Sequence, residues 1–357
     1  IIVGLMTELS AQPIKTFSIG FKEKRFDETE YSNIIANRFK TDHHNFYVDA
    51  RLIEDIDKLV WHYNEPFADS SMLPTYYLSR ETRKYVTVAL SGDAGDENFA
   101  GYLRYLAYKL TDYAKILPNM LRKQFFGILF KLLPPTTKQQ TKYNKFYRLI
   151  EILSKDGADR YLPLIEDFSD VLKEKLYTAD FKKRMSTQNS KQLIERYFNF
   201  LNTDDDLDKL LFTDLNTYLV DDIMTKVDIA SMAVSLECRA PLMDHLFVEY
   251  VSSIHSSLKL KGKTTKYILK ETFKDYFPAA LLNREKMGFT TPVSDWFRTD
   301  LRKFIIDIFD DRFFERGMFE REQILNLLNE HLSAKAEHGY RLWSLMCLEL
   351  WFRKFID

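Results

Sequence analysis

Three acids and two glycines stand close together after a short apolar run at residues 85–90. The segment reads Ser91-Gly92-Asp93-Ala94-Gly95-Asp96-Glu97. Carboxylate oxygens suit Mg²⁺, which takes few protein ligands and completes its shell with phosphate or water. Asp93 or Asp96 could instead cap the next helix, but capping alone does not require so many acids and glycines. We therefore predict a buried strand that delivers a polar loop to a site.

A bound phosphate needs cations, and two lysines are candidates. Lys226 follows Asp222 by four residues, so an ordinary helical ion pair is the alternative to a binding role. Lys286 lies between two predicted helices, where a lysine is usually solvated. Each lysine therefore has an ordinary explanation beside the functional one.

Composition narrows the class of protein. The 357 residues carry a formal net charge of −1, which leaves no basic face for nucleic acid. Cys238 and Cys347 are too few and too distant for a disulfide framework or a thiolate metal cage. No apolar run approaches the ~20 residues of a membrane span. We predict a globular cytoplasmic protein without nucleic-acid or membrane partners.

The first hundred residues alternate between strand and helix patterns. Residues 14–21 and 43–48 are typical of strands, and residues 28–40 between them have one apolar helical face. A strand, a helix and a strand at this spacing form a crossover unit of a parallel sheet. Helices are expected near 52–63 and 74–84, before a third strand that ends at Ser91.

After Gly101 the strand patterns stop and helical patterns follow. They cover residues 102–115, 121–133, 142–154, 191–201, 207–219, 223–236, 266–276 and 340–355. The sequence thus predicts an α/β layer over residues 1–110 and a helical part over residues 111–357. Ligands of an open parallel sheet bind beyond the carboxyl ends of its strands, where the loop at 91–97 would lie.

Several stretches resemble the synthetase domain of the glutamine-hydrolysing asparagine synthetases. The segment from Leu90 to Tyr102 resembles the family's LSGDGGDE-type signature. Residues 226–244 are similar to its KVDRASMAxSLExRxPxLD run, and residues 16–21, 65–69, 284–289 and 342–351 match as well. These matches occur in the family's order over nearly the whole chain, which is more specific than any one motif.

The resemblance implies an α/β fold with a parallel doubly wound sheet of the ATP-pyrophosphatase (adenine nucleotide alpha hydrolase-like) type, followed by a mainly helical half. It also implies ATP and Mg²⁺ as cofactors, with L-aspartate and ammonia as substrates. Such enzymes activate the aspartate side-chain carboxylate as β-aspartyl-AMP and release pyrophosphate, and ammonia derived from glutamine then attacks the anhydride. A glutaminase domain would precede this part, and a homodimer is allowed.

Carried over by position, the resemblance assigns two catalytic residues. Asp93 would orient or deprotonate the ammonia, and Lys286 would offset charge that grows on the α-phosphorus, a task that needs a positioned cation. Asp96 would hold Mg²⁺ with pyrophosphate. The nucleotide-binding residues would be Phe17, Ser18, Ile19, Gly20, Ser91, Gly92, Lys226 and Asp228.

The chain departs from the family's pattern at its start. Residues 1–9 have a helical pattern, but the SGGxDS pyrophosphate loop that relatives carry before this helix is absent, as is the upstream glutaminase domain. We therefore expect an N-terminally truncated chain that is inactive alone. Ala94 replaces a usual glycine and Ile229 a usual arginine, and both changes are tolerable.

Two classes of function stay open at this point. The first is an ATP-dependent amide-forming ligase, either asparagine synthetase or a relative that acts on another carboxylate. The second is a catalytically silent fragment that serves as a binding scaffold. An intact upstream SGGxDS loop would favour the enzyme, and a degraded loop would favour the scaffold.

Overall fold

The chain folds into two compact units that interleave along the sequence. The computed structural model describes residues 1–112, 118–133, 142–187, 189–282 and 288–357. The first unit comprises residues 1–103 and 214–292, and the second comprises residues 104–213 and 293–357. The sequence-based boundary near residue 110 stays a prediction.

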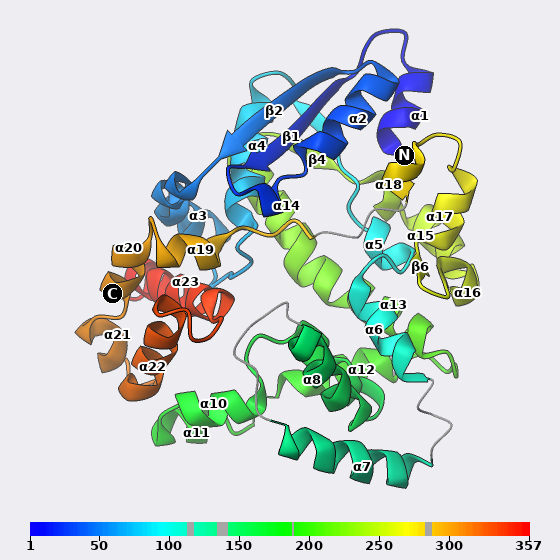
Figure 1. The fold of residues 1–357 in the computed structure, drawn as a ribbon. Coiled ribbons are helices and arrows are strands. Elements are labelled where there is room, and N and C mark those ends of the chain that lie inside the picture. Colours follow the sequence, from blue (N-terminus) through cyan, green and yellow to red (C-terminus); the bar gives the residue numbers. More distant parts are fainter. Residues whose placement is uncertain (113–117, 134–141, 188, 283–287) are drawn as a thin grey trace. The chain divides into compact units, whose positions relative to one another are not determined.

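The first unit combines small sheets with helices (Figure 1). Its strands are β1 (Lys15–Phe21), β2 (Asp42–Val48), β3 (Val88–Leu90), β4 (Glu237–Arg239), β5 (Leu260–Lys261) and β6 (Thr264–Thr265). Its helices are α1 (Ile2–Leu9), α2 (Thr29–Phe39), α3 (Ile56–Tyr63), α4 (Met72–Arg83), α5 (Gly95–Asn98), α14 (Thr225–Met232), α15 (His245–Ser252), α16 (Ser256–Lys259), α17 (Tyr267–Thr272) and α18 (Ala279–Leu282). Its other helical segments are η1 (Lys24–Phe26), η2 (Ala50–Asp55), the π-helical η5 (Tyr218–Met224) and η6 (Pro241–Met243).

Strands β1 and β2 form the predicted crossover unit. They pair in parallel from Lys15 opposite Asp42 to Phe21 opposite Val48, and α2 joins them. The Lys15 ammonium forms an ion pair with Asp42 across the first rung, and the aromatic ring of Phe17 stacks on that of Phe46. These contacts fix the register, because a slip by one residue would move every side chain to the other face.

Strand β3 corrects two expectations. It pairs in parallel with β4. The sequence indicated that strands stop at Gly101, but β4 lies after this residue, and so do β5 and β6, which form an antiparallel pair. The predicted strand at residues 85–90 is present but shorter, at Val88–Leu90, and the prediction that it is buried is wrong, since Val88 and Leu90 are 40% and 39% exposed. Their apolar side chains line a cavity instead of a closed core.

Helices α4 and α14 pack together in the core of the first unit. Helix α4 buries Met72, Leu73 and Tyr76, whose spacing of about one helical turn places them on the same face. Helix α14 buries Lys226, Ala230 and Ser231. This packing brings Lys226, at the start of α14, beside Asp69, in the segment that precedes α4.

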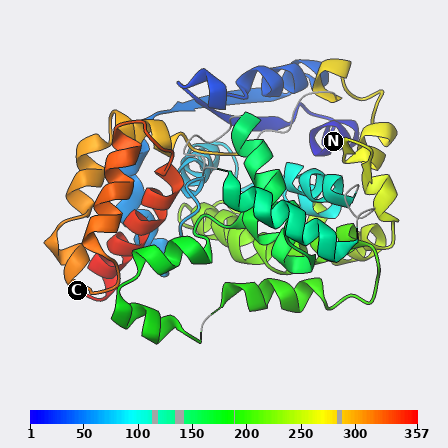
Figure 2. The ribbon, with the colours of Figure 1, turned by 60° about the horizontal axis from the view of Figure 1, so that its bottom comes forward.

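The second unit is helical in the part of the chain that the structure describes. Its helices are α6 (Leu103–Leu110), α7 (Asn119–Leu132), α8 (Lys142–Leu153), α9 (Leu162–Ile165), α10 (Asp170–Leu176), α11 (Ala179–Met185), α12 (Ser190–Phe198), α13 (Asp206–Asn216), α19 (Val293–Arg298), α20 (Arg302–Ile308), α21 (Asp311–Glu315), α22 (Arg321–Leu332) and α23 (Gly339–Phe355), with a 3₁₀ turn η4 (Gly157–Arg160). Figure 2 shows α19 to α23, in orange and red, gathered into one bundle.

The buried His331 forms hydrogen bonds that connect helices of this bundle. The Nε2–H of His331 in α22 donates to the carbonyl oxygen of Ser294 in α19 at 3.1 Å, and its Nδ1 accepts the backbone N–H of His338 at 3.2 Å. The ring is therefore neutral, with its proton on Nε2. Burial, followed by the charge of Arg298, lowers the pKa of His331 to about 4.

We expect the free energy of unfolding to fall in acid because of His331. Its pKa of 6.5 in an unfolded chain drops to about 4 in the folded protein, so folding favours the neutral ring. The stabilisation is complete above about pH 6.5 and should decrease by roughly 3 kcal/mol as the pH falls to 4. Denaturant unfolding across this range should show a flatter slope for His331→Gln, and an unchanged slope for His62→Gln on the exposed face of α3. An equal slope in all three proteins would contradict the prediction.

Candidate active site

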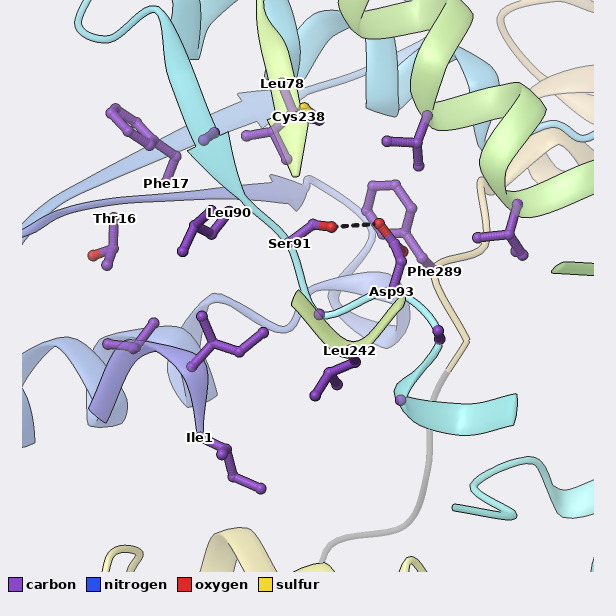
Figure 3. A pocket seen from close by; sticks show the side chains of 18 of the residues that line it. Ile1, Thr16, Phe17, Leu78, Leu90, Ser91, Asp93, Cys238, Leu242 and Phe289 are labelled. Carbon is purple, nitrogen blue, oxygen red and sulfur yellow. Dashed lines mark hydrogen bonds between the residues drawn. The ribbon is translucent and has the colours of Figure 1, made fainter. Parts of the chain in front are cut away.

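The first unit contains a cavity of about 1320 Å³. Residues of α1, β1, α4, β3, α14, β4 and α17 line it, together with the loop between β3 and α5. Figure 3 shows Phe17 reaching it from β1, and Leu90 and Ser91 from β3 and the loop beyond. The volume exceeds what one drug-sized ligand fills, so two substrates can meet in it.

The loop after β3 begins as an extension of the sheet. The backbone N–H of Ser91 donates to the carbonyl oxygen of Arg239 at 2.8 Å, one step beyond the β3–β4 pairing. The Ser91 hydroxyl then donates to the Asp93 carboxylate at 2.6 Å, the dashed contact of Figure 3. A side chain at Gly92 would meet no atom within 4 Å, so this part of the loop is open to a ligand. The strand end therefore fixes the position of the first acid in the cavity.

Backbone strain accompanies this loop. Ala94 and Ala100 have φ angles of 67° and 53°, in the left-handed region that L-residues other than glycine rarely adopt. Strained residues gather where surrounding structure holds a functional geometry. Alanine at position 94 thus has a cost in conformational energy.

Replacing Ala94 with glycine should stabilise the protein. Glycine adopts φ of 67° without a clash of its Cβ, so we expect the free energy of unfolding to rise by about 1 kcal/mol despite the greater freedom of the unfolded chain. Ala89→Gly in the extended strand β3 is the matched control and should lower it. Denaturant midpoints measure both, and a loss of stability in Ala94→Gly would contradict the strain argument.

Asp96 lies opposite a lysine from a distant part of the chain. Its Oδ1 is 3.0 Å from Nζ of Lys266, and both residues line the cavity. A Cβ on Gly101 would come within 2.0 Å of Asp96 Oδ1 and 2.3 Å of Lys266 Cε, so a larger residue there would displace this pair. Asp96, the predicted metal ligand, therefore forms an ion pair with Lys266, which the sequence analysis did not identify.

Glu97, the neighbouring acid, has a different environment. Its side chain is only 1% exposed, and the Tyr102 hydroxyl donates to its Oε1 at 2.6 Å. Burial raises the pKa of Glu97, and burial together with the nearby Glu97 raises that of Tyr102. Of two adjacent acids, Asp96 thus has a cationic partner and Glu97 a neutral hydroxyl.

Lys226 forms a buried ion pair with Asp69. The two charged groups are 2.6 Å apart, although 157 positions separate them in the sequence. Burial opposes ionisation of Asp69, but the Lys226 charge and hydrogen bonds from Ser71 outweigh it and lower its pKa. The hydroxyl of Tyr63 donates to the backbone carbonyl of Lys226 at 3.0 Å. The packing of α4 on α14 thus fixes a charged pair in the cavity wall.

The cavity brings together part of the predicted site. It is lined by Phe17, Ser91, Gly92, Asp93, Asp96 and Lys226. Ser18, Ile19, Gly20 and Asp228 do not line it; Gly20 packs against Asp27 and Thr29, where a Cβ would come within 2.6 Å of each. Lys286 lies outside the described residues. Asp69 also lines the cavity; it was part of a stretch that matches the family, but no role was assigned to it. Lys266 and Lys270 line the cavity too and were not identified from the sequence. Their positive charge within a predicted helix was the only signal that could have identified them.

The cavity carboxylates suit Mg²⁺ that arrives with a phosphate. Among the residues that the structure describes, no three His, Cys, Asp or Glu side chains gather as a metal cage. Mg²⁺ usually takes one or two carboxylates and completes its octahedron with substrate phosphates and water. Asp96, which lines the cavity, could supply one such carboxylate.

Comparison with known sequences places this fold and site in a family. The sequence model of the asparagine synthase family matches residues 1–353, so the chain belongs to that family. It is 27% identical to asparagine synthetase (glutamine-hydrolyzing) 1 of Bacillus subtilis over 339 residues, which cover 95% of this chain and 52% of that protein. It is also 24% identical to asparagine synthetase (glutamine-hydrolyzing) 3 of the same organism, over 80% of this chain and 43% of that protein. A third relative, amidase chyE of Penicillium rubens, is 25% identical over 79% of this chain and 44% of that protein.

The chain spans about half the length of the curated relatives it matches. The resemblance to asparagine synthetases inferred from the sequence motifs is confirmed by the family match. Within the described ranges, none of the helices combines the length and apolar character needed to cross a bilayer.

Proposed function

We propose that this chain is the synthetase part of an ATP-dependent, amide-forming enzyme that converts L-aspartate into asparagine. The observation that carries the proposal is the joint presence in one cavity of Asp93, Asp96 and the Lys226–Asp69 pair, in a chain of the asparagine synthase family. A carboxylate that must be activated and a triphosphate that must be cleaved need this combination of anions, cations and space.

The proposed chemistry has two steps. An oxygen of the aspartate side-chain carboxylate attacks the α-phosphorus of ATP, the bond from that phosphorus to the β-phosphate oxygen breaks, and pyrophosphate leaves. Ammonia derived from glutamine then attacks the acyl carbon, AMP leaves, and the nitrogen loses a proton. Each step develops charge at a fixed point, which oriented groups can stabilise before the reaction begins.

The residues divide between these steps. Phe17, Ser18, Ile19 and Gly20 are proposed to contact the adenine from β1, while Ser91, Gly92, Lys226 and Asp228 act at the nucleotide. Lys286 offsets charge on the α-phosphorus. Phe17, Ser91, Gly92 and Lys226 line the cavity, which supports this division.

The acids of the loop act on the metal and the proton. Asp96 is proposed to hold Mg²⁺, which would supply charge neutralisation for the leaving pyrophosphate. Asp93, positioned by the Ser91 hydroxyl at 2.6 Å, is proposed to orient ammonia and take its proton. Glu97 has no direct role in this scheme, because its carboxylate is buried against Tyr102.

We also propose a wider architecture around this site. The two parallel pairs β1–β2 and β3–β4 would belong to a doubly wound sheet of the ATP-pyrophosphatase type, in an α/β layer at residues 1–110 followed by a helical part at 111–357. A glutaminase domain would supply ammonia, and the enzyme would work in the cytoplasm, with a homodimer allowed. The relatives named glutamine-hydrolyzing support the ammonia source.

The test is aspartate-dependent release of pyrophosphate from ATP by the complete encoded protein. We expect pyrophosphate, AMP and asparagine in equal amounts, with glutamine or ammonium as the nitrogen source and no turnover without Mg²⁺. L-glutamate in place of aspartate tests the choice of carboxylate. Absence of ATP cleavage with every carboxylate would favour the silent scaffold and overturn the proposal.

A further inference from the structure

Helix α7 of the second unit exposes an apolar stripe along its length. Leu121, Phe125, Ile128 and Leu132, which we call the α7 stripe, are spaced by four, three and four residues and so share one face of the helix. Their exposed fractions lie between 58% and 75%. A single exposed leucine is ordinary, but four aligned large apolar side chains form a patch that is typical of an interaction surface.

The inward face of α7 is anchored to α8 and to the segment after it. The two helices pack together, and the ring centroids of Phe130 and Tyr147 lie 4.9 Å apart. The Arg122 side chain is 1% exposed; its guanidinium donates to the carbonyl oxygen of Lys155 at 3.1 Å and pairs with Asp156. The α7 stripe therefore cannot turn inward without breaking these contacts.

The surroundings of the stripe are strongly basic. Residues 119–150 contain seven lysines and arginines and no aspartate or glutamate, in a chain whose net charge is −1. Within α7, Lys131 is exposed one helical turn after Ile128, and the exposed Lys123 pairs with Asp156. The balanced charge of the whole chain thus conceals a local cationic segment, and charge complementarity favours an anionic partner.

A second copy of the chain does not match this charge. Two α7 stripes packed on each other would bring together two cationic segments that contain no acid between residues 119 and 150, and like charges placed opposite each other oppose association. An acidic protein would have to supply an apolar groove bordered by acids along the whole of α7, which is about 21 Å long.

An anionic lipid surface matches both features without a groove. Its phosphates lie directly above its acyl chains, so an apolar stripe can insert at that boundary while neighbouring lysines keep their ammonium groups among the phosphates. The cationic segment has the composition that binds anionic membrane surfaces, four to eight lysines and arginines on or beside an amphipathic helix.

We propose that the α7 stripe and its basic surroundings bind the surface of an anionic phospholipid bilayer, with α7 lying in the plane of that surface. Such attachment needs no membrane-spanning helix. The proposal replaces the expectation from overall charge and hydropathy that the protein has no membrane partner. It does not rest on the proposed reaction, because none of the four stripe residues lines the cavity of the first unit.

Cosedimentation of the complete encoded protein with phospholipid vesicles tests this surface. We expect binding to vesicles made of equal parts phosphatidylglycerol and phosphatidylcholine, weaker binding at high salt, and little binding to phosphatidylcholine alone. Phe125→Gln should weaken binding about tenfold, because it removes an apolar ring from the stripe. Ile128→Gln provides the same test if Phe125→Gln does not fold.

Phe200→Gln is the matched control for the apolar contact. Phe200 is 71% exposed and its ring contacts that of Phe212, much as the 62% exposed Phe125 contacts Phe126, but it lies outside the cationic segment. This variant should bind vesicles like wild type. An equal loss of binding in Phe125→Gln and Phe200→Gln would contradict a specific role of the α7 stripe.

The charge is tested by Lys131→Gln, which should weaken binding to the anionic vesicles about fivefold. Lys175→Gln is its control, because Lys175 is also exposed in the last turn of a helix, α10, but outside the cationic segment. Equal binding of wild type to neutral and anionic vesicles would overturn the proposal. Absence of vesicle binding would also overturn it and leave a protein partner; a dimer in solution that Phe125→Gln dissociates would then identify a second copy.

Discussion

Replacing Lys226 with methionine should lower the free energy of unfolding by about 3 kcal/mol and reduce asparagine formation by at least about 100-fold. The stability loss follows from the position of the pair, since the Lys226 side chain is 7% exposed and its ammonium lies 2.6 Å from Asp69. Without it, the Asp69 carboxylate stays buried with only the hydrogen bonds from Ser71. Denaturant unfolding and pyrophosphate release measure the two effects.

The partner substitution separates stability from function. Asp69→Asn removes the charge that Lys226 opposes, and the double variant of Lys226→Met with Asp69→Asn leaves no unpaired charge. We expect the double variant to regain part of the lost stability but none of the activity, because the cation at the cavity wall is still missing. Recovery of activity in the double variant would show that Lys226 acts only as a structural partner of Asp69.

Local sequence patterns were sufficient for the first layer of the fold. The sequence patterns of β1, α2 and β2 indicated a strand, a helix and a strand, and their spacing indicated the parallel crossover that the structure has. The loop after β3 could also be predicted from the sequence, because its acids and glycines are close together in the chain. Ser91, Asp93 and Asp96 were identified as a group for that reason, and the cavity contains all three.

Partners that come from distant segments could not be predicted in the same way. Asp69 meets Lys226 only because α4 packs on α14, and Lys266 meets Asp96 only because its segment returns beside Phe99 and Gly101. Strand β4 was missed for a related reason: three residues after a helix carry no periodicity, and pairing with β3 alone makes them extended. Long-range packing decides these contacts, and it has no local signature.

The same limit applies to the chemistry of adjacent acids. Asp93, Asp96 and Glu97 look equivalent in sequence, yet the structure gives them a serine hydroxyl, a lysine ammonium and a tyrosine hydroxyl as partners. Burial then raises the pKa of Glu97. An acid opposed by a cation can exchange that cation for a metal, whereas a buried acid against a neutral hydroxyl is better suited to holding the loop.

Asp93→Asn should divide the proposed reaction between its two steps. Asparagine has nearly the same shape and can still accept the Ser91 hydroxyl, which lies 2.6 Å from the native carboxylate, so the loop should keep its geometry. Aspartate-dependent exchange of labelled pyrophosphate into ATP reports only the first step and should stay within a few-fold of wild type. Asparagine formation needs a proton acceptor for the attacking nitrogen and should fall by about 100-fold or more, the usual contribution of a positioned base.

A carboxylate on a longer stem provides the control for this experiment. Asp93→Glu restores a proton acceptor in the cavity, so it should recover a substantial part of asparagine formation while Asp93→Asn does not. Both variants are expected to retain the first step, adenylation. A difference between them in asparagine formation must therefore arise at the attack of ammonia. Equal loss of both steps in Asp93→Asn would instead assign Asp93 to nucleotide binding, and unchanged asparagine formation would remove it from the reaction altogether.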